Sequence, residues 1–428
     1  MFEIMQLTAI SIFIFSYSLI LSGKVNKTLA AVIGAVLVVA TGVVPSDIVL
    51  SFINWESLGL LAGMFIIVTA LKLAGFFRWV GLHIAKTVDH HPVLMFFTLP
   101  LITGGLSSFL DAVTVILVMA TMTIEILDGL EINPTPFIMA EIFAANIGGS
   151  ATMMSDPTNV VIGTSLGYSL TDFLANTGPI SYSVLVLILA ALGVINRGYL
   201  KEGLMKHPIH KYRLTHKPKD AILDWRLLKV SVLAFFLAVT LLAIQEIVGI
   251  SAAMAAIFAA TLILAFDLRG SFGIIKKVDW SILLFFGGLF VVVGGLKNTG
   301  VLNLVATAIS SVTGENLVIA ITVVFLLAAV LSIFVDNVAL ATAFIPVIQG
   351  IAVYDGLELA PLAWALSLGV CFGGVATPFG TATNIAGLSI CNRMNHPICW
   401  KSYFRTTAPL TLMVLLLADT FLILRYAL

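Results

Sequence analysis

The sequence predicts an all-α protein that crosses a membrane many times and is built from two inverted repeats. Three observations predict this class: a composition poor in charge, apolar runs of membrane-crossing length, and a self-match at one fixed offset. Of the 428 residues, 60% are hydrophobic and only 10% are charged. Soluble domains carry about 25% charged residues, so this chain lacks the polar side chains to cover a water-facing surface. Its mean hydropathy of +1.11 agrees.

Apolar runs such as Leu7–Leu21, Leu29–Val44 and Leu58–Leu73 recur along the chain. Each is close to the length that a helix needs to cross about 30 Å of hydrocarbon, whereas a β-barrel would show short alternating strands. In the first half we expect crossings over residues 5–22, 28–45, 55–75, 137–165 and 178–196. The further apolar stretch 93–127 is interrupted near Gly104–Ser108, and we interpret it as a re-entrant hairpin with Asp111 close to its tip.

The second half repeats the first without gaps at an offset of 225 residues, which takes Trp55 to Trp280. Apolar residues could match by chance, but Trp, Lys, Asp and Asn would not do so at one offset over so long a stretch. The matches include Gly63 and Gly288, Lys72 and Lys297, Asp111 and Asp336, Ala151-Thr152 and Ala376-Thr377, and Asn159 and Asn384. We therefore expect a first repeat over residues 1–196, a linker over 197–226 and a second repeat over 227–428.

The linker 197–226 is the only long hydrophilic stretch and is rich in Lys, Arg and His. The positive-inside rule places it in the cytoplasm, which predicts a multi-pass protein of the cell (inner or plasma) membrane. Five crossings and one hairpin bring the chain to the opposite side of the membrane, so the second half must be inverted relative to the first. Inverted repeats with interrupted helices are typical of secondary transporters.

The first pair of polar motifs places an aspartate in an apolar stretch of each half. Asp111 is followed by Thr114, and Asp336 is followed by Asn337. An ionised carboxylate at membrane depth is costly, so it should face a cavity, a cation or a proton. The alternative is an aspartate that only caps the second limb of each hairpin. Capping alone does not explain the symmetric pair, so these four residues are predicted to bind substrate or ion.

The second pair of motifs, 146–159 and 371–384, interrupts a helix in each half with glycine pairs and prolines. Non-helical backbone at membrane depth is tolerated where it is buried in protein or lines a cavity. A simple Pro/Gly kink is the alternative, but kinks rarely bring Asp and Asn with them in both halves. The binding residues predicted here are Asn146, Ser155, Asp156, Thr158, Asn159, Thr381, Thr383 and Asn384. Oxygen ligands suit hard cations, so Na⁺ is expected at Asp111, Asn159, Asp336 and Asn384.

Other polar residues carry weaker signals. Glu125 and Glu141 could relay protons inside the membrane or could lie at its interface. Lys72 and Lys297 are expected to snorkel rather than to bind substrate. The three cysteines show neither zinc nor disulfide spacing, and the net charge of zero suggests no nucleic-acid partner. Apart from Na⁺ or H⁺ as a coupling ion, no cofactor is expected.

These motifs resemble those of the ion transporter superfamily. The run NIGGSATMMSDPTNVVIG at 146–163 is similar to the signature N-I-G-G-x-A-T-x-x-G-D-P-P-N-x-x-I-G, and LSIFVDNVAL at 331–340 is similar to L-S-x-x-x-D-N-x-x-x. The branch that the chain resembles holds arsenite-efflux permeases, the melanosomal P protein and related Na⁺/H⁺ antiporters. Sodium–dicarboxylate and citrate transporters are more distant. The chain departs from the pattern at Ala112, Ser155 and Thr158, and the lost amide at Ala112 argues against a symmetric pair of cation sites.

The resemblance implies a transporter rather than an enzyme. It implies hairpin tips that meet interrupted helices at a midplane site, a scaffold and a transport domain, elevator-type movement and a homodimer within membrane lipid. The sequence has no nucleotide-binding motif, and an ATPase partner, as some arsenite permeases have, is left open.

We expect coupling to H⁺ or Na⁺ through Asp111, Asp156 and Asp336. Because Asp111 and Asp336 would repel a di- or trianion, efflux of uncharged arsenite or antimonite, or Na⁺/H⁺ antiport, is favoured. A citrate or dicarboxylate symporter of the same superfamily is the alternative. An intramembrane aspartyl protease is a remote alternative, because the motifs around the aspartates do not match that chemistry. A passive channel is another, because paired hairpins also occur in channels, and uphill accumulation would exclude it.

Overall fold

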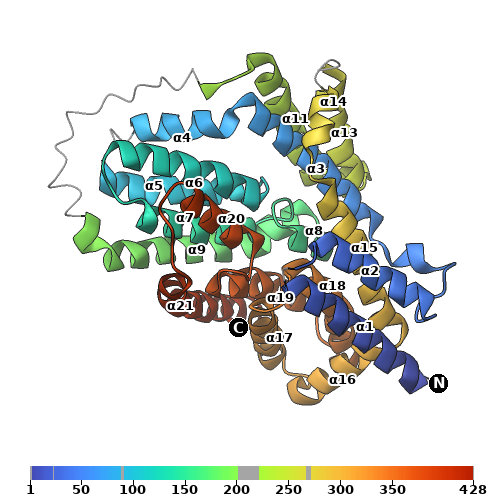
Figure 1. Ribbon diagram of the computed structural model, residues 1–428. Coiled ribbons are helices and arrows are strands. Elements are labelled where there is room, and N and C mark those ends of the chain that lie inside the picture. Colours follow the sequence, from blue (N-terminus) through green and yellow to red (C-terminus); the bar gives the residue numbers. More distant parts are fainter. Residues whose placement is uncertain (1, 23, 88–90, 201–220, 267–270, 428) are drawn as a thin grey trace.

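The computed structural model describes residues 2–22, 24–87, 91–200, 221–266 and 271–427 (Figure 1). In these residues the regular secondary structure is entirely helical. Nine helices within the described ranges are long and apolar enough to cross a membrane. The predicted class, an all-α polytopic membrane protein, is confirmed.

The first half forms α1 (Phe2–Ser22), α2 (Lys27–Ala40), η1 (Val49–Phe52), α3 (Trp55–Ala74), α4 (Phe76–Thr87), α5 (Pro92–Ser107), α6 (Ala112–Gly129), α7 (Thr135–Gly149), α8 (Pro157–Leu166) and α9 (Leu170–Ile195). The second half forms α11 (Trp225–Ala243), α12 (Gln245–Val248), α13 (Ala252–Phe266), α14 (Ser271–Lys277), α15 (Trp280–Asn298), α16 (Val301–Thr313), α17 (Leu317–Ser332), α18 (Asn337–Asp355), α19 (Leu359–Gly373), η3 (Gly374–Ala376), α20 (Ala382–Arg393) and α21 (Trp400–Tyr426). Side-chain caps begin several of them, among them Asn26 for α2, Asn54 for α3 and Asp279 for α15.

The helices of the second half follow those of the first at the offset seen in the sequence. Helices α3 and α15 begin at Trp55 and Trp280, and α6 and α18 begin directly after Asp111 and Asp336. Helices α8 and α20 also start 225 residues apart, at 157 and 382. The repeat boundaries and the inverted orientation stay predictions. Most of the predicted linker, residues 201–220, lies outside the described residues.

Each half packs one helix against the other half. Helix α3 packs against α13 of the second half, and α15 packs against α2 of the first half (Figure 1). A Cβ added at Gly63 would lie 2.6 Å from the carbonyl carbon of Ala256, and one added at Gly288 would lie 2.9 Å from that of Ala31. The offset of 225 relates one contact to the other, so glycine allows the same close approach twice.

Three predicted boundaries differ from the structure. The crossing expected over 137–165 is the helix pair α7 and α8, separated by non-helical residues 150–156. The helix expected at 178 begins at Leu170, because Ser169 and Asp172 form a capping box there. Helix α2 ends at Ala40, just before Gly42 with its positive φ of 71°. The hairpin is α5 and α6 joined by a short turn. Its re-entry into the membrane stays a prediction.

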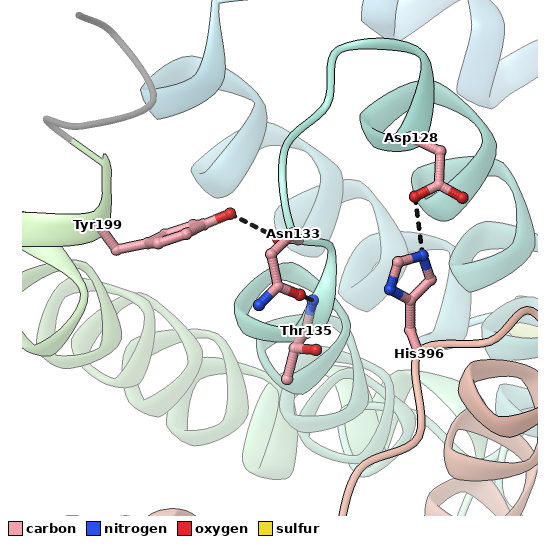
Figure 2. Close-up of polar contacts among 5 residues, drawn as sticks. All are labelled: Asp128, Asn133, Thr135, Tyr199 and His396. Atoms are coloured by element: carbon pink, nitrogen blue, oxygen red, sulfur yellow. Dashed lines mark hydrogen bonds and ion pairs between the residues drawn. The ribbon is translucent and has the colours of Figure 1, made fainter. Parts of the chain in front are cut away.

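Loops at one end of α6, α7 and α20 are joined by hydrogen bonds (Figure 2). His396 Nε2 lies 2.8 Å from Asp128 Oδ1, which connects the loop after α20 to the end of α6. The side-chain oxygen of Asn133 accepts a 3.0 Å bond from the Thr135 N–H, and the Asn133 carbonyl accepts a 2.7 Å bond from the Tyr199 hydroxyl. The end of α6 is therefore held to the second half, and the start of α7 to the chain that follows α9.

Candidate functional site

The aspartates at the two hairpin tips are helix N-caps. Asp111 Oδ2 accepts a 2.8 Å bond from the Thr114 N–H at the start of α6. Asp336 Oδ1 accepts a 3.1 Å bond from the Val338 N–H at the start of α18. Helix capping, which the sequence analysis gave as the alternative to binding, is thus part of their role. It uses one carboxylate oxygen of each residue, and binding of a substrate or ion by the other stays a prediction.

Two asparagines hold the interrupted helices together. Asn159 Nδ2 donates to the carbonyls of Ser150 and Thr152, at 3.3 and 3.0 Å. Asn384 Nδ2 donates to the carbonyls of Gly374 and Thr377, at 3.0 and 2.8 Å. These carbonyls lie where α7 and α19 unwind, so each amide satisfies backbone groups that the broken helix leaves without partners.

The oxygens of the same two amides reach across to the other half. Asn384 Oδ1 accepts a 2.9 Å bond from Asn146 Nδ2 of α7. Asn159 Oδ1 accepts a 2.7 Å bond from Ser367 of α19, and the Cys371 thiol lies 3.9 Å away. Asn146, Asn159 and Asn384 are all buried. The structure therefore brings the two predicted motifs together at one place.

Thr152 and Thr377 fasten the hairpin tips to the interrupted helices. The Thr152 hydroxyl donates to the Ser108 carbonyl at the first tip. The Thr377 hydroxyl donates to the Ile333 carbonyl at the second tip, at 3.5 Å. Neither threonine was among the predicted site residues. The signal was present, because the pair Ala-Thr recurs at the 225-residue offset.

The second hairpin tip forms an acidic sub-site with the start of α8. Asp156 caps α8 by accepting a 2.8 Å bond from the Thr158 N–H, and the Cys371 thiol lies 3.5 Å from its Oδ2. Asp156 and Asp336 lie close enough for their charges to interact, and Tyr17 is near Asp336. The hydroxyls of Thr158 and Tyr17 are buried with no hydrogen-bond partner among the described residues. Neighbouring acidic groups and unpartnered hydroxyls are suited to a proton or a small cation.

The first hairpin tip faces a cavity of about 750 Å³. Its polar lining consists of Lys27, Lys72, Lys277, Asp111, Asp279, Asn26, Thr28, Thr69, Thr114 and Ser281. Ala382, next to the α20 N-cap Thr381, also lines it. The Lys72 ammonium attracts the Asp111 carboxylate electrostatically, and the Lys27 ammonium attracts the Asp336 carboxylate. Three ammonium groups against two carboxylates leave the lining with an excess of positive charge. The sequence analysis missed this role for the lysines, because the fold gathers them from separate segments.

The remaining predicted residues lie close to these two sub-sites. Ser155 donates a 2.8 Å bond to the Gly149 carbonyl, and Thr381 caps α20 by accepting a 3.1 Å bond from the Asn384 N–H. Asn337 accepts a 2.8 Å bond from Ser332. Thr383 is buried in the first turn of α20.

The first half has Ala112 where the second half has Asn337, and the hydrogen bonds at the two hairpin tips differ as a result. In the second half, the Ser332 hydroxyl lies 2.8 Å from Asn337 Oδ1 and 2.6 Å from the Val370 carbonyl oxygen, either of which can accept its hydrogen bond. Its counterpart Ser107 is fully buried, and its hydroxyl has no hydrogen-bond partner among the described residues. The two halves therefore match in backbone but not in polar side chains at the hairpin tips.

The four expected Na⁺ ligands have different surroundings in the structure. Asp336 begins α18, which packs against α8, and Asp111 begins α6, which packs against α20. The oxygens of Asn159 and Asn384 already accept hydrogen bonds from the protein. Over the ranges that the structure describes, no three His, Cys, Asp or Glu side chains group to hold a metal ion. Na⁺ binding at these residues stays a prediction.

The helical fold, the interrupted helices and a polar site inside an apolar protein define a membrane transporter. Comparison with known proteins gives the family. Residues 17–369 match the model of the citrate transporter family, CitMHS, and the chain belongs to this family of the ion transporter superfamily. The family consists of transporters and not enzymes.

Relatives cover nearly the whole chain. A 46 kDa membrane protein of Mycobacterium leprae is 33% identical over 430 residues, which is 99% of each chain. An uncharacterized transporter of Mycobacterium tuberculosis is 33% identical over 428 residues, again 99% of each. The human P protein is 28% identical over 479 residues, covering 92% of this chain and 57% of its own length. The expected kinship with P protein-like transporters is confirmed.

Two solved structures share the fold. The YdaH transporter of Alcanivorax borkumensis has a TM-score of 0.59 at 15% identity, covering 89% of this chain and 88% of its own. MtrF of Neisseria gonorrhoeae, described as illuminating a class of antimetabolite efflux pumps, has a TM-score of 0.54 at 12% identity, covering 91% and 84%. At such low identity the likeness concerns the fold alone.

Proposed function

We propose that this protein is a secondary active transporter that carries a small carboxylate anion across the cell membrane, coupled to H⁺ or Na⁺. The observation that carries the proposal is the cavity with Lys27, Lys72 and Lys277 around Asp111. A cleft with an excess of one charge concentrates ligands of the other sign. The sequence alone favoured a neutral or cationic substrate because of its aspartates, and the lysines reverse that balance.

The acidic sub-site is the proposed place of coupling. Asp156 and Asp336 repel each other when both are ionised, and a proton or Na⁺ bound between them relieves that repulsion. The buried hydroxyls of Thr158 and Tyr17 add oxygen ligands on the same side. In this proposal the second hairpin tip binds the cation and the first hairpin tip binds the anion.

Arsenite or antimonite efflux is the second candidate, and the Cys371 thiol beside Asp156 favours it. A thiol is a soft ligand, and arsenic(III) is a soft centre. Replacing Cys371 by alanine should then weaken arsenite binding more than carboxylate binding. Equal arsenite transport by the variant would exclude the thiol as a ligand. Na⁺/H⁺ antiport would also use Asp156 and Asp336, and it would proceed without any organic substrate.

The proposal includes the expected setting: a homodimer in the cell membrane, a cytoplasmic central linker, and elevator movement of α5 to α9 and their second-half counterparts. Cross-linking in membranes would test the dimer. Labelling from each side of the membrane would test the position of the linker.

The test is uptake into proteoliposomes with citrate, magnesium-citrate, succinate, arsenite and antimonite, under an imposed pH or Na⁺ gradient. Lys72→Gln should raise the substrate concentration needed for half-maximal uptake about tenfold for an anion, with little change for arsenite. Lys297→Gln is the matched control, because Lys297 is the repeat counterpart of Lys72 and does not line the cavity. Equal effects of the two variants would overturn the anion-binding role.

A further inference from the structure

Glu141 is a carboxylic acid buried in an apolar cluster away from the cavity. It lies in α7 with no exposed surface, where α6, α7 and α20 pack together (Figure 1). The buried apolar cluster where these helices meet consists of Ile116, Ala120, Ile124, Ile138, Met139, Ile142, Ala145, Ala386 and Cys391, together with Tyr403 of α21. The sequence analysis left its depth open, and the structure places it inside the protein.

Only half of the Glu141 carboxyl group is hydrogen-bonded. Oε1 accepts a 2.6 Å bond from the Thr123 hydroxyl of α6. Oε2 is buried and has no hydrogen-bond partner among the described residues. A buried acid kept only for packing would be expected to have both oxygens bonded, because an unpaired buried oxygen costs about 1–3 kcal/mol. This oxygen is therefore available to a proton or to a water molecule.

No cation balances Glu141 in the described part of the chain. Helices α5, α6, α9, α19 and α20 pack against α7. Their titratable groups are Glu125 and Asp128 on α6, Asp172 and Tyr182 on α9, Cys371 on α19, and Cys391 and Arg393 on α20, and the buried cluster also contains Tyr403 of α21. Of these, the Cys391 thiol is the group that interacts with Glu141. An ionised carboxylate would be left uncompensated here, so the neutral acid is the form that the surroundings favour.

The position of Glu141 connects it to the transport site. Its own helix carries Asn146, whose amide bonds to Asn384 on α20. Helix α6, which supplies Thr123, begins directly after Asp111 at the hairpin tip, and α20 begins at Ala382, which lines the cavity. Any separation or hydration of these three helices changes the surroundings of Glu141 and of the site together.

We propose that Glu141 is a proton-binding site of the transport cycle, which takes up H⁺ when α6, α7 and α20 are closed and releases it when water reaches them. The step is simple protonation: the carboxylate binds one H⁺ at Oε2, and Thr123 keeps donating to Oε1. The proposal rests on the proposed transport function and assigns H⁺ as a coupling ion. It also places that proton apart from Asp156 and Asp336.

The test compares Glu141→Gln, which keeps the shape of the neutral acid, with Glu125→Gln. Glu125 lies on α6 and is exposed, 3.9 Å from Arg78, so it is a control of the same type. In proteoliposomes Glu141→Gln should reduce accumulation driven by a pH gradient by about tenfold or more, while substrate exchange without a gradient stays close to wild type. Accumulation equal to that of Glu125→Gln would overturn the proposal.

Thr123→Val separates proton binding from a structural role. It removes the donor that stabilises the anion, so the pH of half-maximal exchange should move upwards, and Thr121→Val should leave it in place. An unchanged pH profile would contradict the proposal. Infrared difference spectra recorded over a pH titration need no substrate, and they should contain a carboxylic-acid band that Glu141→Gln lacks. If wild type transports none of the test substrates but this band titrates, the carboxylate-transport proposal fails and the proton site stands. If the band is absent, the proton site fails.

Discussion

Asn146 of the first half donates a 2.9 Å hydrogen bond to Asn384 of the second half, and the bond is buried. At the related position of the second half stands Cys371, and there Asn159 accepts instead from Ser367. Both amides also bond to the unwound backbone of their own half. The two motifs therefore depend on each other, because each half's interrupted helix is closed by an amide that the other half contacts.

Replacing Asn384 by alanine should destabilise the protein strongly. Two backbone carbonyls and the Asn146 amide would lose their buried partner, at a cost of about 2–4 kcal/mol in all. Thermal unfolding in detergent measures the change, and Asn303→Ala, on the exposed face of α16, is the control. Equal unfolding temperatures for the two variants would contradict the role of Asn384.

Two adjacent glycines in α15 should respond oppositely to alanine. A Cβ at Gly288 would lie 2.9 Å from the backbone of Ala31, so Gly288→Ala should cost about 1–3 kcal/mol by pushing α2 away. A Cβ at Gly287 meets no atom within 4 Å, so Gly287→Ala should be neutral or stabilise the helix by up to about 1 kcal/mol. The difference is read from paired unfolding curves, and equal stability of the two variants would contradict the close packing of α15 on α2.

Thr152→Val should loosen the first hairpin tip. The variant keeps the shape of the side chain but loses the hydrogen bond to the Ser108 carbonyl, which should cost about 1 kcal/mol. Thr121→Val is the matched control, because the Thr121 hydroxyl only bonds back to Leu117 in its own helix. Faster hydrogen exchange at residues 107–111 in Thr152→Val alone is expected. Equal exchange in both variants would show that Thr152 does not hold the tip.

Much of the fold could be predicted because membrane helices follow from apolar length, and the repeat reveals which polar residues matter. Asp111 and Asp336 were found in this way at the hairpin tips, and Asn159 and Asn384 at the interrupted helices. Helix boundaries were less accurate where a local cap decides them, as Ser169 does for α9.

The parts that could not be predicted depend on tertiary contact. A sequence pattern does not say whether the oxygen of Asn384 faces an ion or another amide, and the structure shows Asn146 there. It also does not reveal that Lys27, Lys72 and Lys277 meet at one cavity, because they come from three segments that are far apart in the chain. The sequence pattern also presents capping by Asp111 as an alternative to binding, whereas the structure shows that the residue does cap α6.

The most direct test of the account is accumulation of radiolabelled citrate or succinate in proteoliposomes against its own gradient, driven by an imposed pH or Na⁺ gradient. We expect wild type and the control Asp47→Asn to accumulate substrate, and Asp336→Asn to lose about tenfold or more of this accumulation while still exchanging substrate. Equal gradient-driven accumulation by Asp336→Asn, or only downhill flux by wild type, would contradict the account.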